Sequence, residues 1–150
     1  EFFTESFWEI QLRLCLRDYR VGVSACFALL SPEEDEVMGV CNYTSIIKGT
    51  FQSTHLGYAM AAKHEGKGIM REALIKTNRY MFEQKGLHRI MAAYLPINAR
   101  SGKLLNNLGF EKEGYARKYL RINGRWEDHV LTALVNGPVQ TRANEFLSQN

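Results

Sequence analysis

Two glycines, Gly66 and Gly68, stand between a strand-like stretch and a long helical pattern, within residues 65–71. Glycine lets the backbone approach a ligand closely, and the first N–H groups of a helix have no partners within the helix. Those N–H groups and the helix dipole attract phosphate oxygens. The segment therefore predicts an anion site, although a tight turn before the helix explains a lone glycine pair equally well. It is neither a P-loop nor a three-glycine dinucleotide loop, because both motifs need residues that are missing here.

A second polar cluster follows one strand later, where Asn98 and Ser101 precede leucines at helical spacing. An asparagine at this position caps a helix by accepting a hydrogen bond from its first N–H groups. Taken alone, the two residues are explained most simply by capping. Because the glycine segment precedes them, ligand binding becomes the favoured role of Asn98.

The composition is that of one globular domain. The chain has 150 residues, of which 45% are hydrophobic and 23% charged, and its formal net charge of +3 is too small to identify a nucleic-acid-binding protein. The sequence has no apolar run near the roughly 20 residues of a membrane span and no signal-peptide arrangement at its start. Its cysteines are odd in number and too far apart for a metal or redox motif, so we expect core residues of a cytoplasmic protein at Cys15, Cys26 and Cys41.

Three further groups of residues have no site-like spacing. The histidines lack the spacing of metal ligands, so we expect packing or surface roles and no metal for His55, His64, His88 and His129. Packing on the sheet is expected for the tyrosines Tyr58, Tyr94 and Tyr115. The basic run at residues 117–125 is typical of a solvated strand face.

Hydrophobic spacing predicts the elements that position these residues. A helix is expected at residues 6–19, capped by Thr4 or Ser6 and ended by Gly22, although alternating apolar residues there also fit a strand. An acidic turn then joins two arms of a hairpin. The strands of this half are expected at residues 23–30, at 37–44 and near 55–61.

The second half contains two helices of similar design. The first covers residues 69–82 and ends before Gly86, and the second follows Asn98 and ends at Gly109, because glycine tolerates the left-handed conformation that ends helices. The dipeptide Asn123-Gly124 is a strong hairpin signal. Strands are expected at residues 89–95, 110–122 and 125–135. The order helix, three strands, helix, strand, helix, two strands predicts an α/β fold with a mixed sheet.

The two polar segments, at this distance from one another, resemble the GNAT superfamily of N-acetyltransferases, which use acetyl-coenzyme A. In that family a Gln/Arg-x-x-Gly-x-Gly/Ala loop binds the coenzyme pyrophosphate, and a later Asn-x-x-Ser followed by Leu-Gly-Phe marks the helix beside the pantetheine arm. This sequence keeps the middle glycine as Gly68 but has Glu65 and Met70 at the flanking positions. The backbone cradle is therefore kept, while Glu65 replaces the Gln or Arg side chain of the family loop.

A finer match resembles the ribosomal-protein-alanine N-acetyltransferases and covers residues 8–134. It includes Leu56-Gly57-Tyr58, His88-Arg89-Ile90-Met91-Ala92, residues 109–115 and residues 128–134. The resemblance implies a GNAT-like, mostly antiparallel sheet flanked by helices in a domain of residues 1–136, followed by a tail at 137–150. Because the chain starts without methionine, we also expect that it lacks the family's first strand and helix.

The resemblance implies a role for each candidate site residue, with acetyl-CoA as cosubstrate and no metal. A strand ending at Leu95 would diverge from the one before it and open a cleft, in which Asn98 holds the pantetheine arm and Ser101 protonates the leaving thiolate. The arm would lie along the backbone of Tyr58, Ala59 and Met60. The pyrophosphate would be received by Gly66, Lys67, Gly68, Ile69, Met70 and Arg71.

The general base is not identified by the resemblance. Related ribosomal enzymes use a glutamate and a tyrosine where this sequence has Ala93 and Leu105. Three titratable residues, Glu113, Asp128 and His129, remain as alternatives, each with an ordinary structural role as the simpler interpretation.

The expected reaction is direct attack of a protein N-terminal α-amine on the thioester, within a ternary complex. An α-amine, with a pKa of about 8, loses its proton more easily than a lysine near 10.4. The resemblance makes the acceptor a ribosomal protein with a small first residue and involves no membrane. A ribosome contact is the alternative role of the basic residues within 117–125. A small-amine acetyltransferase acting on polyamines or aminoglycosides, and a noncatalytic module that binds coenzyme A or RNA, are the two alternatives.

Overall fold

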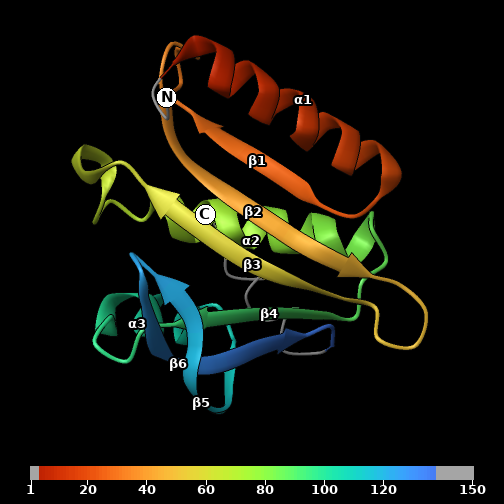
Figure 1. Cartoon of the computed structure of the whole chain (residues 1–150), viewed down its shortest axis with the longest axis vertical. Helices are drawn as coiled ribbons and strands as arrows, with labels where there is room; N and C mark the ends of the chain where they lie inside the picture. Colours follow the sequence, from red (N-terminus) through yellow and green to blue (C-terminus); the bar gives the residue numbers. More distant parts are fainter. Residues whose placement is uncertain (1–3, 138–150) are drawn as a thin grey trace, which may run out of the picture.

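A six-stranded sheet forms the centre of the computed structural model, which describes residues 4–137 (Figure 1). Across the sheet the strands lie in the order β1-β2-β3-β4-β6-β5, and among them only the neighbours β3 and β4 run parallel. The predicted mixed, mostly antiparallel sheet is confirmed. The strands are β1 Ala25–Leu30, β2 Val37–Ile47, β3 Ser53–Met60, β4 Arg89–Tyr94, β5 Glu111–Ile122 and β6 Arg125–Val135.

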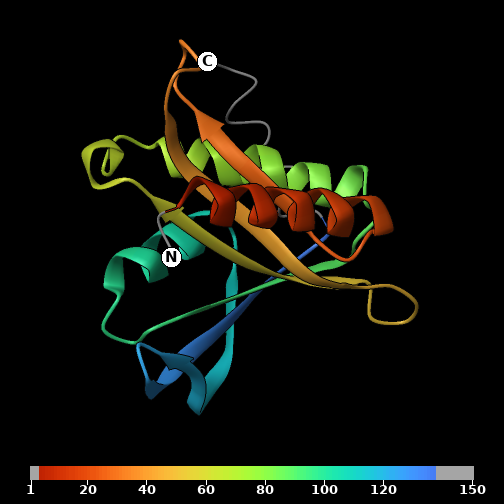
Figure 2. The same ribbon diagram turned by 45° about the horizontal axis from the view of Figure 1, so that its top comes forward.

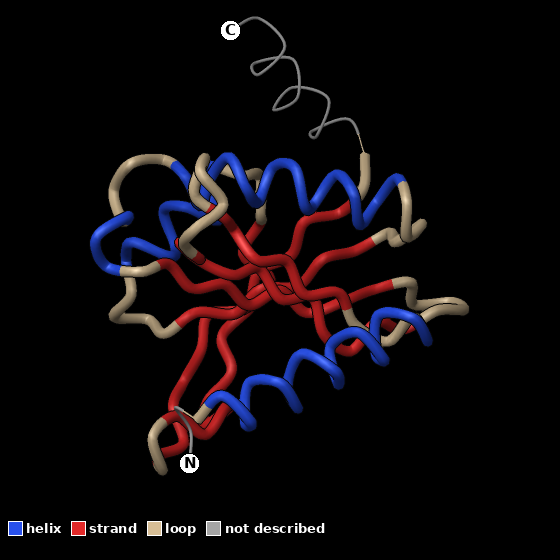
Figure 3. Tube along the Cα trace, turned by 90° about the horizontal axis from the view of Figure 1, so that it is seen from above, coloured by secondary structure: helices blue, strands red, loops and turns tan. Residues whose placement is uncertain are grey.

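Among the described residues, three α-helices cover the two faces of this sheet. Helix α1 lies on one face, and α2 and α3 lie on the other (Figure 3). A short 3₁₀ helix, Ala62–His64, precedes α2. The predicted order of helices and strands is confirmed, with α1 at Glu5–Val21, α2 at Ile69–Glu83 and α3 at Ala99–Asn107.

Local capping residues explain why α1 is a helix rather than a strand. The Thr4 hydroxyl accepts a hydrogen bond from the N–H of Phe7, and Gly22 ends the helix in the left-handed conformation with φ of 81°. The helical interpretation of this segment is confirmed, and the strand alternative is wrong. No described residue of α1 is buried, so its apolar side chains cover the sheet only partly.

The buried core lies between the sheet and α2 and fixes that helix in place. Tyr43 of β2 is fully buried, and its hydroxyl donates to Asn78 Oδ1 at 2.6 Å and lies 2.7 Å from Thr77 Oγ1. Because these buried polar groups satisfy one another, α2 is held in one position against the strands. The glycine segment that precedes α2 is therefore attached to a rigid element. The fully buried apolar side chains of this core include Leu74, Met81, Leu87, Ile90 and Leu105.

The hairpin of β5 and β6 extends away from α1 and α2 (Figure 2). Its turn has positive φ at Asn123 and Gly124, 48° and 81°, which confirms the predicted two-residue turn. The pairing shifts between Ala116 and Leu120, where Lys118 also has positive φ.

Within residues 4–137, no helix is long and apolar enough to cross a membrane. The predicted tail falls almost wholly in residues 138–150, which lie outside the described residues, so the domain boundary at 136 stays a prediction.

Candidate active site

The site begins where β3 and β4 separate. The two parallel strands pair only at Ser53–Arg89, Thr54–Ile90 and His55–Met91. Further along, β3 stays paired with β2 and β4 with β6, so their facing edges no longer pair with each other. Peptide groups on those edges are free to bind an extended ligand. The predicted divergence of these strands is confirmed.

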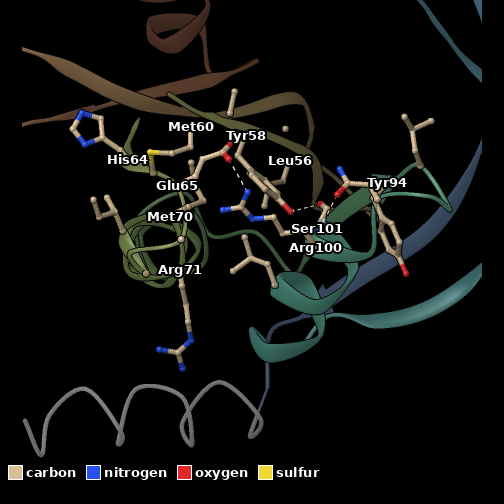
Figure 4. Close-up of a pocket in the computed structure, with 18 of the residues that line it drawn as sticks. Leu56, Tyr58, Met60, His64, Glu65, Met70, Arg71, Tyr94, Arg100 and Ser101 are labelled. Carbon is tan, nitrogen blue, oxygen red and sulfur yellow. Dashed lines mark hydrogen bonds and ion pairs between the residues drawn. The ribbon is translucent and has the colours of Figure 1, made fainter. Parts of the chain in front are cut away.

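A cavity of about 680 Å³ occupies this gap (Figure 4). Its walls come from residues 56–60 of β3, the segment leading into α2, the end of β4 and the start of α3. Of the predicted site residues, Lys67 does not line the cavity. The ten that do are Tyr58, Ala59, Met60, Gly66, Gly68, Ile69, Met70, Arg71, Asn98 and Ser101.

The start of α2 opens toward this cavity. Gly68 is the N-cap of the helix, with φ of 77°, and no side chain caps the helix there. Gly66 has φ of 73°, so the chain takes two left-handed steps that other residues adopt only with strain. A Cβ built on Gly68 would meet no atom within 4 Å. The first N–H groups of α2 thus have neither side-chain partners nor a covering side chain, which is the geometry of an anion cradle.

The start of α3 is closed by its own cap. Asn98 Oδ1 accepts a hydrogen bond of 3.1 Å from the N–H of Ser101, so the capping role of Asn98 is confirmed. Asn98 also lines the cavity, and capping uses only its side-chain oxygen. Its side-chain NH₂ group keeps two donors for a ligand, and ligand binding by Asn98 stays a prediction.

The hydroxyl groups of Ser101 and Tyr58 meet inside the cavity. Ser101 Oγ lies 2.5 Å from the phenol oxygen of Tyr58, and either oxygen can donate. Burial raises the pKa of Tyr58 above its ordinary value, so the phenol keeps its proton at neutral pH. The sequence interpretation assigned Tyr58 only a backbone contact and a packing role, and this contact between hydroxyl groups was not foreseen.

The other two tyrosines differ in their relation to the cavity. Tyr94 lines the cavity and also packs against Gly102, where an added Cβ would come within 2.8 Å of the ring, so its predicted packing role is confirmed. Tyr115 is exposed on β5 and donates to the carboxylate of Asp128.

An ion pair that the sequence interpretation did not include crosses the cavity. Arg100 Nη1 lies 2.6 Å from Glu65 Oε2, and both residues line the cavity. Figure 4 shows the Arg100 guanidinium beside Glu65, while the Arg71 side chain points away from the pair. The only sequence signal for this contact was the position of Arg100 between Asn98 and Ser101, in the first turn of a capped helix.

Among the three candidates for a general base, only His129 lines the cavity. The carboxylate of Glu113 binds Arg89 at 2.6 Å, and that of Asp128 accepts from the N–H of Lys118 at 2.8 Å, so the pKa of each acid is lowered. Both carboxylates therefore act as structural partners. His129 is buried, and its Nδ1 lies 3.0 Å from the carbonyl oxygen of Glu127. Because a carbonyl can only accept, that contact places the ring proton on Nδ1 and leaves Nε2 as an acceptor in the neutral ring.

The three cysteines are free thiols outside the cavity, as expected. Cys41 is fully buried, and burial raises the pKa of its thiol to about 11. Cys26 is exposed on the edge strand β1 and Cys15 is half-buried on α1, so the expectation that all three are core residues is wrong. In the part of the chain that the structure describes, no group of three or more His, Cys, Asp or Glu residues could hold a metal ion.

A family model described as an acetyltransferase (GNAT) domain matches residues 4–111. The chain belongs to the GNAT acetyltransferase family. It is 48% identical over 127 residues to the ribosomal protein uS5-alanine N-acetyltransferase of Escherichia coli K12, an alignment that covers 85% of this chain. This chain spans 66% of the length of that relative.

Solved structures of GNAT family members share the fold. Ribosomal-protein-S5-alanine acetyltransferase from Vibrio fischeri has a TM-score of 0.86 at 42% identity, covering 90% of this chain and 74% of the other. Mycobacterium smegmatis RimJ, solved in complex with CoA-disulfide, has a TM-score of 0.84 at 27% identity, covering 93% and 68%. The resemblance inferred from the two polar segments is confirmed at the level of family and fold.

Proposed function

We propose that this protein transfers an acetyl group from acetyl-CoA to the N-terminal α-amine of a protein. The observation that carries the proposal is a single cavity that runs from the uncapped start of α2 to the Ser101 hydroxyl. Family membership and 48% identity to a ribosomal protein uS5-alanine N-acetyltransferase support the same reaction.

The two ends of the cavity give the coenzyme one orientation. Its pyrophosphate would lie at the N–H groups that follow Gly68, and its pantetheine arm would extend along the free edge of β3 at Tyr58, Ala59 and Met60. Asn98 would donate to the arm through its side-chain NH₂ group. The thioester would then lie toward the Ser101 end of the cavity, where β3 and β4 diverge.

In the transfer step, the acceptor nitrogen attacks the thioester carbon, and a main-chain N–H at the diverging strands stabilises the negative charge on the carbonyl oxygen. The C–N bond forms as the C–S bond breaks, and the coenzyme leaves as a thiolate. Ser101 gives its proton to that thiolate and regains one from the Tyr58 hydroxyl, with which it is already in contact. Nε2 of His129 takes the proton that the amine loses. Exchange with solvent then removes that proton from His129 and restores the proton of Tyr58.

The acceptor is proposed to be a ribosomal protein that begins with a small residue. The activity of the Escherichia coli relative suggests this substrate class, and the exposed basic residues Arg117, Lys118, Arg121 and Arg125 form a surface suited to a ribosome contact. With a ribosomal acceptor, we propose that the reaction takes place in the cytoplasm, and the free thiols support this location.

The test is mass spectrometry of the chain with acetyl-CoA and a panel of acceptors. We expect one acetyl group on a peptide that carries the N-terminus of uS5, and none on the matched peptide whose α-amine is blocked. Acetylation of polyamines or aminoglycosides in place of the peptide would favour a small-amine enzyme. If coenzyme binds and no acceptor is modified, the chain is a noncatalytic coenzyme-binding module and the proposal is wrong.

A further inference from the structure

The Glu65–Arg100 ion pair joins the two helix starts that form the cavity. Glu65 lies in the loop before α2, and Arg100 lies in the first turn of α3, 35 residues later. Their contact at 2.6 Å is therefore made by the tertiary fold and not by neighbours in the chain.

The guanidinium of Arg100 lies beside Gly66. A Cβ built on Gly66 would lie 3.8 Å from Arg100 Nη2. The Arg71 side chain points away from this position, and Lys67 does not line the cavity (Figure 4). Among the described residues of the cavity, Arg100 is therefore the cation that lies over the predicted phosphate cradle.

The ion pair is exposed to solvent, so a ligand can replace Glu65 as the partner of Arg100. The side chains of Arg100 and Glu65 are 63% and 42% exposed, and exposed pairs of this kind add little to the stability of a fold. A phosphate group offers the guanidinium a stronger partner, because it accepts two parallel hydrogen bonds and carries more negative charge. The carboxylate of Glu65, in contrast, repels a phosphate that approaches the same N–H groups.

We propose that Arg100 binds the coenzyme pyrophosphate and that Glu65 holds the guanidinium over the cradle until the coenzyme arrives. This inference rests on the proposed function and adds to it a binding residue from α3 and an internal competitor. Coenzyme binding breaks the Glu65–Arg100 pair and forms an Arg100–phosphate pair. The affinity for the coenzyme is then set by the difference between the two interactions.

The experiment is calorimetric titration of coenzyme A into the wild-type chain and two variants. Arg100→Gln should weaken binding about tenfold, the usual scale for a charge-assisted hydrogen bond at a partly exposed site. Glu65→Gln should tighten binding about threefold, because the competitor and the repulsion are both removed. The matched controls are Arg79→Gln and Glu83→Gln, which make the same charge changes in the exposed pair on α2, and they should leave the affinity unchanged.

Two truncated ligands identify the phosphate involved. Dephospho-CoA keeps the pyrophosphate and should show the same penalty with Arg100→Gln, whereas pantetheine has no phosphate and should bind both proteins equally. Unchanged coenzyme affinity in Arg100→Gln, or a penalty that disappears with dephospho-CoA, would overturn the role of Arg100 while leaving acetyl transfer standing. A wild-type chain that binds none of the ligands would contradict the proposed function itself.

Discussion

The starts of α2 and α3 face the same cavity but are built in opposite ways. At α3 a side chain, Asn98, satisfies the helix N–H of Ser101, and the hydroxyl of Ser101 points to Tyr58. At α2 the N-cap is Gly68, which has no side chain to offer. A capped helix start keeps its own side chains fixed for chemistry, whereas an uncapped start keeps its backbone N–H groups available for a ligand.

The largest effect is expected from the capped start, through its hydroxyl. Ser101→Ala removes the proposed proton donor and should lower kcat about 100-fold, the low end for general acid catalysis, with little change in coenzyme affinity. Tyr58→Phe, which leaves Ser101 in place, should lower kcat by a smaller factor, about threefold. Steady-state kinetics and calorimetry measure the two quantities separately. A Ser101→Ala variant with full kcat would remove the assigned role of this residue.

At the uncapped start of α2, a substitution should change the coenzyme affinity and not kcat. Gly68→Val introduces a β-branched residue at positive φ and fills the approach to the N–H groups, so coenzyme affinity should fall about 30-fold, as for the loss of one strong hydrogen bond. Gly124→Val is the matched control, since Gly124 also has positive φ and open space around it but lies in the β5–β6 turn. Calorimetry that shows equal affinities for both variants would contradict the phosphate cradle.

Two substitutions of Asn98 separate its role as the cap of α3 from its proposed role in binding the coenzyme. Asn98→Ala loses both the cap and the NH₂ donors, and it should destabilise the protein by about 1 kcal/mol in denaturant unfolding. Asn98→Asp keeps a capping oxygen but has no NH₂ group, so stability should be retained while coenzyme affinity falls several-fold. If Asn98→Asp binds the coenzyme as tightly as the wild type, Asn98 is a cap only.

No effect on turnover is expected from the cysteines, none of which lines the cavity. A variant with Cys15→Ser, Cys26→Ser and Cys41→Ala should keep kcat within about twofold, because direct transfer uses no acyl-cysteine intermediate. The measurement is steady-state turnover together with coenzyme affinity and thermal unfolding. Lost turnover in a folded variant that still binds coenzyme would point to a covalent mechanism.

The fold could be predicted from the sequence because its signals are local. Thr4 and Asn98 mark helix starts through their capping side chains, and the glycines at positions 22, 86 and 109 mark helix ends through their left-handed conformation. Apolar spacing identifies the faces between those ends. The backbone cradle at the start of α2 could be predicted for the same reason, since Gly68 and the helix after it are adjacent in the chain.

The contacts inside the cavity could not be predicted in this way. Tyr58 meets Ser101 across 43 residues and Glu65 meets Arg100 across 35, so each contact depends on how β3, α2 and α3 are packed. The same limit applies to the base candidates, because the partners of Glu113 and Asp128 are set by the register of the sheet. The expectation for Cys26 was wrong because Cys26 lies on the face of the edge strand β1 that α1 covers only partly, whereas the neighbouring Ala25 is fully buried.

The comparison of the two helix starts is tested most directly by nuclear magnetic resonance titration of the isotope-labelled chain with coenzyme A. The account predicts that the amide signals of Gly66, Gly68 and Ile69 move most, because their N–H groups would receive the phosphate oxygens. The amide of Ser101, already bound to Asn98, should move less. Saturable binding that leaves the amides of residues 66–70 unshifted would contradict the central claim that the uncapped start of α2 holds the coenzyme.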